Sequence, residues 1–122
     1  MMGLKTLSRG LAVGAFLALG ACSGDLLTGG PLVRPGEPTG TIVVHNQTGI
    51  SVPAVAISAC DVGSYGLNRL PDGMWLDPGE SYAFTVSSGC WDVLVGNGYR
   101  EVRQRMQVRA GGGVNFYVTE DA

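Results

Sequence analysis

The chain has 122 residues, the size of a single domain. Eight Lys or Arg residues stand against ten Asp or Glu residues, which gives a formal net charge of −2 at neutral pH. Nucleic-acid binding depends on clustered cations that neutralise phosphates, so this balance argues against a nucleic-acid partner.

Residues 1–21 have the layout of an export signal. Lys5 and Arg9 supply a positive start, and the apolar run that follows, Leu11–Leu19, is nine residues long. A transmembrane helix needs about 20 apolar residues, so the run is too short to span a bilayer. A buried core helix remains the alternative. The run ends in Leu19-Gly20-Ala21-Cys22, which offers the small residues that a signal peptidase requires.

This N-terminus resembles the signal peptide and cleavage box of a bacterial lipoprotein. The resemblance implies that the chain is exported, that cleavage leaves Cys22 as the first residue, and that its sulfur carries a lipid such as palmitate. Several acyl chains make attachment effectively permanent, because one chain alone binds only marginally. Ser23 follows the cysteine, a pattern that in enteric-type bacteria implies release to the outer membrane. We therefore expect a lipid-anchored cell-envelope protein that faces the periplasm.

Removal of residues 1–21 leaves a formal net charge of −4, because Lys5 and Arg9 are lost. After the lipidated Cys22 we expect a flexible linker as far as residue 39, since residues 23–39 contain four Gly and three Pro and no sustained periodicity. The apolar residues of this stretch leave a second interpretation open, in which it packs onto the domain or lies at the lipid surface. They are Leu26, Leu27, Leu32 and Val33.

From residue 40 to residue 122 apolar residues recur with period two, and turn signals return at short intervals. This pattern predicts an all-β domain. We expect a small antiparallel β-sandwich of six to seven strands with one disulfide. Ile42 and Val44, for example, share the inward face of the first strand. The expected strands are 41–46, 52–59, 81–86, 90–95, 103–109 and 114–118.

Glycine and proline mark the connections between these strands. Pro78-Gly79 has the residue types of a type II turn, and Asn97-Gly98 is typical of a tight hairpin between Val95 and Tyr99. Pro71-Asp72-Gly73 and Gly111–Gly113 are further turn signals. No strand-to-helix context or P-loop lysine accompanies these glycines, so we expect them to shape connections and not to bind phosphate.

Two cysteines remain once Cys22 carries lipid. Cys60 and Cys90 form an even pair in an exported chain, where disulfides persist, so we predict a structural disulfide. The alternatives are a metal site or a redox pair. Both are disfavoured, because no Cys-x-x-Cys occurs and His45 is the only histidine.

Four motifs give the domain a resemblance. The first strand ends in Asn46-Gln47-Thr48, an aromatic-Gly-x-Asn-x-Leu segment begins at Tyr65, a Pro-Gly turn follows Asp77, and Trp91-Asp92 begins an apolar strand. Residues 40 to about 96 thereby resemble a class of short, secreted, mostly uncharacterised bacterial β proteins, in which Trp is common at the Tyr65 position. The resemblance implies a β fold and no known activity. A looser likeness to transthyretin-like accessory domains of secreted enzymes rests on generic turns.

Asp92 is a carboxylate in an otherwise apolar strand, beside Cys90. We expect it to point outward, or to cap a loop by accepting hydrogen bonds from Asn68, Arg69 or nearby backbone N–H groups; ligand binding is the alternative. Arg103, Arg105 and Arg109 share parity and should form a basic stripe on a solvent face, which discourages edge-to-edge pairing. An anionic partner, such as lipopolysaccharide or an acidic glycan, is the alternative for this stripe.

Trp75 lies between two turns and either covers the core, which we favour, or is an exposed aromatic contact. Tyr65 is the second aromatic candidate for a ligand surface. The candidate contacts for a ligand or partner are thus Tyr65, Asn68, Arg69, Trp75, Asp92, Arg103, Arg105 and Arg109.

His45 is the only conventional catalytic base, and it has no acidic neighbour in sequence. We expect it at a solvent-facing strand position, and we expect no catalytic residue, metal or cofactor. The sequence favours a tethered structural or protein-interaction module that docks on another envelope protein. A glycan or small-ligand binding module is the alternative, which an exposed aromatic platform would indicate. An enzyme is the least favoured class.

Overall fold

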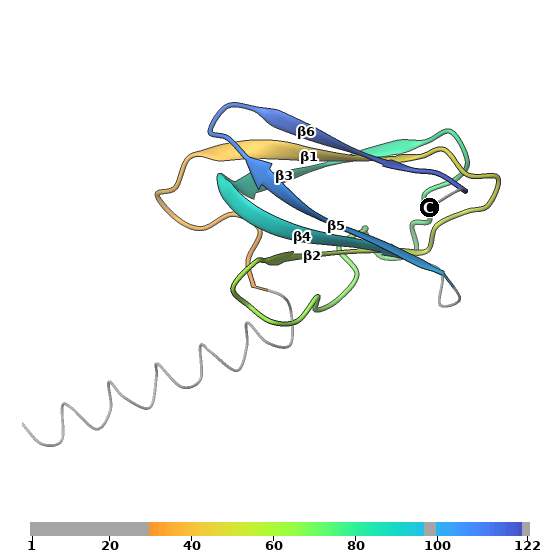
Figure 1. Ribbon diagram of the computed structural model, residues 1–122, viewed down its shortest axis with the longest axis horizontal. Coiled ribbons are helices and arrows are strands. Elements are labelled where there is room, and N and C mark those ends of the chain that lie inside the picture. Colours follow the sequence, from red (N-terminus) through yellow and green to blue (C-terminus); the bar gives the residue numbers. More distant parts are fainter. Residues whose placement is uncertain (1–29, 97–99, 121–122) are drawn as a thin grey trace, which may run out of the picture.

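The computed structural model describes residues 30–96 and 100–120. Within these residues six strands form two three-stranded sheets that lie face to face (Figure 1). The expected all-β sandwich is confirmed. The signal peptide, Cys22 and the Asn97-Gly98 turn lie outside the described residues. The strands are β1 (Thr39–Asn46), β2 (Ala54–Ala59), β3 (Ser81–Ser87), β4 (Gly89–Gly96), β5 (Glu101–Val108) and β6 (Gly113–Val118).

The first sheet has the order β3-β1-β6 and the second has the order β2-β4-β5. Three of the four strand pairings are antiparallel, as expected. The fourth pairing differs, because β1 and β6 run parallel, with His45 opposite Tyr117. A parallel pair requires a crossover connection. Here the chain passes to the second sheet as β2, returns to the first sheet as β3, and passes to the second sheet again as β4 and β5 before it returns as β6.

The core lies between the sheets and is built by the period-two pattern. In β1 the buried residues alternate with half-buried ones, so Ile42 and Val44 face inward, as predicted. Trp91 in β4 is also fully buried, and its Nε1 donates a hydrogen bond to the Ser87 carbonyl oxygen at 2.7 Å. The indole therefore brings its polar atom into the core without an unsatisfied donor.

The second strand begins two residues later than expected. Pro53 has no N–H to donate to a ladder, and the regular pairing of β2 with β4 starts at Ala54. Val52 instead forms an isolated bridge with Leu76, through two backbone hydrogen bonds of 2.8 Å.

The predicted Pro-Gly turn before β3 is confirmed. Gly79 has a φ of 84°, and the Glu80 N–H donates to the Asp77 carbonyl oxygen at 2.9 Å. A positive φ at the third residue of the turn is the requirement of type II geometry, which explains the glycine.

The predicted disulfide joins Cys60 to Cys90, whose Cα atoms are 5.5 Å apart. Cys60 directly follows β2, and Cys90 is the second residue of β4. The disulfide therefore links two neighbouring strands of the second sheet.

Residues 30–38, which we call the lead-in segment, lie against the sandwich. Leu32 packs on the core, and its carbonyl oxygen accepts a hydrogen bond from Ser87 N at 2.7 Å. Arg34 N donates to Ser87 Oγ at 2.7 Å, and the Arg34 guanidinium lies 5.2 Å from the centroid of a Trp91 ring. This part of the expected linker is therefore docked on the domain, and only Val33 among its large apolar side chains is exposed.

Candidate functional site

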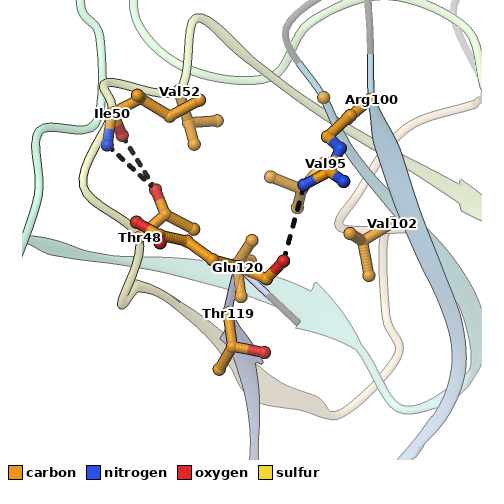
Figure 2. Close-up of a pocket in the computed structure, with 10 residues that line it drawn as sticks. Thr48, Ile50, Val52, Val95, Arg100, Val102, Thr119 and Glu120 are labelled. Carbon is orange, nitrogen blue, oxygen red and sulfur yellow. Dashed lines mark hydrogen bonds between the residues drawn. The ribbon is translucent and has the colours of Figure 1, made fainter. Parts of the chain in front are cut away.

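A pocket of about 70 Å³ opens at one end of the sandwich (Figure 2). Its lining is mostly apolar and includes Val95 at the end of β4, Val102 at the start of β5 and Val118 at the end of β6. Inward positions meet here at the ends of three strands, where the sheets stop covering each other. The lead-in segment, which is orange in Figure 1, bonds Ser87 beside the start of β1, at the other end of the strands from this pocket.

The rim of the pocket combines one apolar and two charged side chains. Ile50 is 53% exposed. Arg100 Nη1 donates to the Glu120 carbonyl oxygen at 3.5 Å, and the Glu120 carboxylate accepts a hydrogen bond from Gly49 N. Figure 2 shows the contact between Arg100 and Glu120 across the mouth. These bonds connect the start of β5, the loop after β1 and the end of the described chain.

The surroundings of the pocket are acidic. Asp77 and Glu80 lie in the turn next to the end of β1, where the Glu80 carbonyl oxygen accepts from Asn46 N at 2.9 Å. Glu101 begins β5. With Glu120, four carboxylates therefore stand at this end, against Arg100 as the one cation among its described residues.

Four of the predicted contact residues come together elsewhere, on the outer face of the second sheet. Asp92 accepts two hydrogen bonds from Arg105, at 2.9 and 3.0 Å, because the two residues are directly opposite in β4 and β5. The guanidinium of Arg103 lies 5.6 Å from the ring centroid of Tyr65. The hydrogen bonds and the charge of Asp92 raise the pKa of Arg105. Arg109 is exposed beyond the end of β5.

Asp92 does not receive the hydrogen bonds that we predicted from Asn68 or Arg69. Both residues instead cover the free edge of β2. Asn68 Oδ1 accepts from Val55 N at 2.9 Å, and Arg69 donates through Nη2 to the Ile57 carbonyl oxygen at 3.0 Å and also to the Gly30 carbonyl oxygen. Burial lowers the pKa of the Arg69 guanidinium. Since these polar groups bond backbone that would otherwise form an open edge, we assign both residues a structural role.

Trp75 is 59% exposed, so the favoured expectation that it covers the core is wrong. The neighbouring Leu76 bridges Val52 and is fully buried. Neighbouring side chains in extended backbone point to opposite sides, and Trp75 is therefore turned outward. The described aromatic pairs are His45 with Tyr117 and Tyr82 with Phe84, so neither Trp75 nor Tyr65 belongs to a pair of stacked rings.

His45 lies on the outer face of the first sheet, as expected, and forms a cluster that the sequence analysis missed. Its ring stacks on Tyr117 with centroids 4.6 Å apart and planes 13° apart. Its nitrogens bond Ser81 Oγ at 2.7 Å and Asn115 Oδ1 at 2.8 Å. Tyr117 is 54% exposed. No local signal reveals this cluster, because it depends on the parallel register of β1 and β6.

Comparison with protein-family models and with curated proteins found no match to this chain. Among the described residues, no three His, Cys, Asp or Glu side chains are grouped so that they could hold a metal ion. The same residues include no helix long and apolar enough to cross a membrane. The pocket and the outer faces of the two sheets are therefore the candidate sites of the described domain.

Proposed function

We propose that this chain is a lipid-anchored protein of the bacterial cell envelope, on the periplasmic face of the outer membrane, and that it docks on another envelope protein. The anchor is Cys22 in Leu19-Gly20-Ala21-Cys22. The docking site is the pocket bordered by Ile50, and this open apolar hollow at the end of the domain is the observation that carries the proposal. We assign no catalytic residue.

The size of the pocket favours a protein side chain as its occupant. Its volume of about 70 Å³ is roughly half that of the engineered apolar cavity of about 150 Å³ that binds benzene. Sites for drug-sized ligands are larger and present several convergent polar groups. A single aliphatic side chain of a partner fits the volume and the apolar lining better than a free small molecule does.

The charges around the pocket narrow the class of partner. Four carboxylates lie at the pocket end of the sandwich, those of Asp77, Glu80, Glu101 and Glu120, and of these only Glu120 lines the pocket. Complementary charge speeds encounter and suppresses wrong partners. The partner should therefore present an aliphatic side chain with Lys or Arg residues beside it.

Photo-crosslinking in cells tests the docking site. A photoreactive residue at position 50 should crosslink to one envelope protein, and the same residue at position 67 should not, although Leu67 is also exposed. Ile50→Glu should remove that protein from preparations of the lipidated chain in detergent, whereas Leu67→Glu should retain it. Equal retention by the two variants would contradict docking at the pocket.

The anchor is tested separately from the docking site. Mass spectrometry should find acyl chains on Cys22, and Cys22→Ser should move the protein from the membrane fraction to the soluble fraction. Unchanged membrane association of Cys22→Ser would overturn the lipid anchor.

Glycan binding is the second candidate, and the cluster of His45 and Tyr117 favours it. Tyr117 is half exposed on an open sheet face and lies beside Asn115, two residues earlier in β6. Exposed aromatic rings with polar neighbours suit sugar rings. Binding to a glycan array that is lost in Tyr117→Ala and retained in Ile50→Glu would favour this function over docking at the pocket.

A further inference from the structure

β3 is an edge strand of the first sheet, and it pairs with β1 on one side only. In an antiparallel pair, residues that exchange hydrogen bonds alternate with residues that do not. Asn46 N donates to the Glu80 carbonyl oxygen at 2.9 Å, so the even-numbered residues on this side bond β1. The odd-numbered residues of β3 therefore direct their backbone N–H and C=O groups to the other side of the strand. They begin with Ser81, Ala83 and Thr85.

The lead-in segment closes one end of this open side. Ser87, the next odd-numbered residue, donates its N–H to the Leu32 carbonyl oxygen at 2.7 Å, as the alternation requires. Within residues 30–96 and 100–120, no group bonds the outward N–H and C=O groups between Ser81 and Thr85. A strand that adds to β3 can therefore pair with residues 81–85 and must end before Leu32.

The other sheet edges are protected against strand addition. Asn68 and Arg69 cover β2, because they bond its backbone at Val55 and Ile57. β5 has alternating charged residues, and charged side chains on an edge discourage pairing. β6 begins with a glycine, which weakens a strand. β3 has the sequence SYAFTVS, without charge, proline or glycine, and its open edge is thus a template for another strand.

A second copy of β3 fits this edge under a two-fold axis. Antiparallel pairing centred on Ala83 places Ala83 opposite itself and Ser81 opposite Thr85 of the second copy. Every outward backbone group of residues 81–85 then has a partner, and the small, uncharged side chains do not repel one another. An axis closer to Ser87 would bring the second strand into Leu32. A two-fold interface of this kind closes at two copies.

The same axis brings aromatic side chains together on the other face of β3. Tyr82 is half-buried and packs on Phe84, with ring centroids 4.8 Å apart. In the dimer Tyr82 lies opposite Phe84 of the second copy, in a pair without hydrogen bonds, where Cα atoms approach to about 4.5 Å. Aromatic cross-strand pairs stabilise a sheet. The strand's own sequence thus supplies both the matching edge and the aromatic contacts, which argues for a second copy as the occupant.

We infer that the protein forms a symmetric dimer through β3, in which the two three-stranded sheets join into one continuous sheet. None of the described residues that line the pocket belongs to β3. Dimer formation and docking at the pocket therefore use different residues, and the dimer does not depend on the lipid anchor.

Disulfide cross-linking tests the edge and its register. The full chain as isolated from cells, in a non-ionic detergent, is oxidised with copper phenanthroline and scored on non-reducing gels. Ala83→Cys should cross-link to a dimer, because Cα atoms of a hydrogen-bonded pair are about 5.5 Å apart, within the range of a disulfide. Thr85→Cys alone should cross-link about tenfold less, since the two copies are offset by about 13 Å along the strand. A mixture of Ser81→Cys and Thr85→Cys should cross-link again.

A charge variant tests the dimer without oxidation. Ala83 is exposed, so Ala83→Lys leaves the single copy intact but places two like charges opposite each other at the axis, which destabilises the pairing. Gln107→Lys is the matched control, because it places the same charge on an exposed position of β5. Sedimentation in the same detergent should find Ala83→Lys as a monomer, and the original chain and Gln107→Lys as dimers.

Each contrary result overturns the β3 dimer. A monomeric original chain would do so, as would Ala83→Cys that keeps its unfolding midpoint and does not cross-link. Equal cross-linking of Thr85→Cys and Ala83→Cys would indicate random collision. Cross-linking of Asn115→Cys in place of Ala83→Cys would assign the contact to β6, and Ala83→Cys joined to a different protein would mean that a foreign strand occupies the edge.

Discussion

Asn46 Nδ2 donates a hydrogen bond to the Leu76 carbonyl oxygen at 2.8 Å, and through it the end of β1 holds the segment that precedes β3. Asn46 is fully buried. Its Nδ2 also donates to the Ile50 carbonyl oxygen at 2.8 Å, and its Oδ1 accepts from Thr48 N at 3.0 Å and from Thr48 Oγ1 at 2.6 Å. The amide is thus fully satisfied and shapes the loop that forms one wall of the pocket.

We predict that replacing this amide makes stability depend on pH. In Asn46→Asp the ionised carboxylate cannot donate to the carbonyl oxygens of Leu76 and Ile50, so the folded state disfavours it and the folded-state pKa rises above the ordinary value of about 4. The folded state then binds a proton more tightly than the unfolded state. The variant therefore loses stability as the pH rises through the ordinary carboxyl range toward the folded-state pKa, and regains it on acidification.

Urea unfolding of the variants relative to the original chain at pH 4 and pH 7 checks this prediction. Asn46→Ala is the control, because it removes the same hydrogen bonds without introducing a titrating group. It should cost about 2 to 4 kcal/mol of unfolding free energy at both pH values. An Asp variant whose deficit is the same at pH 4 and pH 7 would contradict the role assigned to the two donated hydrogen bonds.

Gly40 in β1 is required because another part of the chain passes close to it. A Cβ at this position would lie 2.5 Å from Val108 Cγ1 and 2.6 Å from the Arg109 carbonyl oxygen. Gly40→Ala should therefore destabilise the fold by about 2 kcal/mol. Gly113 begins β6 and offers a matched control, because the nearest atom to its Cβ would be the Thr41 carbonyl oxygen at 3.6 Å.

Chemical denaturation of both alanine variants measures the difference. Gly113→Ala should stay within about 0.5 kcal/mol of the original chain, as surface substitutions usually do. Equal losses in the two variants would mean that the crowding around Gly40 is relieved at no cost.

The disulfide should contribute a large part of the stability of so small a domain. The two cysteines are 30 residues apart, and closing a loop of that length in the unfolded chain is worth about 3 to 4 kcal/mol in the chain-entropy model. Cys60→Ala combined with Cys90→Ala should lower the unfolding free energy by about that amount. Without reductant, the two sulfurs of the original chain should not react with iodoacetamide, and mass spectrometry checks this directly.

The strands could be predicted from the sequence because each strand carries its own signal. Residues that alternate inward and outward, such as Ile42 and Val44, reveal a strand without knowledge of its partner. The Gly79 turn is equally local, since a positive φ restricts the residue type. The disulfide between Cys60 and Cys90 could be predicted from the number of cysteines and the expected export alone.

The properties that depend on pairing were not predictable in the same way. A two-residue Asn97-Gly98 turn would place Gly96 opposite Tyr99 and Asp92 opposite Arg103. The observed register places Gly96 opposite Glu101, and Asp92 therefore meets Arg105. The shift of two residues leaves the same side chains of β5 on the outer face, so the predicted outward face is correct. The shift also changes the residue opposite Asp92, so the ion pair with Arg105 was not predicted.

The pocket and the position of Trp75 show a second limit. The pocket is lined by residues near 50, 95, 102 and 118, which lie at the ends of different elements. No local sequence pattern predicts that these ends come together. At Met74-Trp75-Leu76, three apolar residues follow one another, so periodicity cannot say which one enters the core. The bridge between Leu76 and Val52 decides it.

The docking of the lead-in segment gives the last prediction. Leu32 is half buried against the core, and its neighbour Val33 is exposed. The Ser87 and Ser88 amides donate to the carbonyl oxygens of Leu32 and Pro38, at 2.7 and 2.8 Å. Leu32→Asp should therefore release the segment, lower the unfolding free energy by about 1 to 2 kcal/mol and speed hydrogen exchange at both amides.

Val33→Asp is the matched control, because it places the same charge one residue later on an exposed side chain. It should leave hydrogen exchange at the Ser87 and Ser88 amides unchanged, and NMR-detected exchange measures both variants. Fast exchange at these amides in the original chain would show that residues 30–38 are not docked.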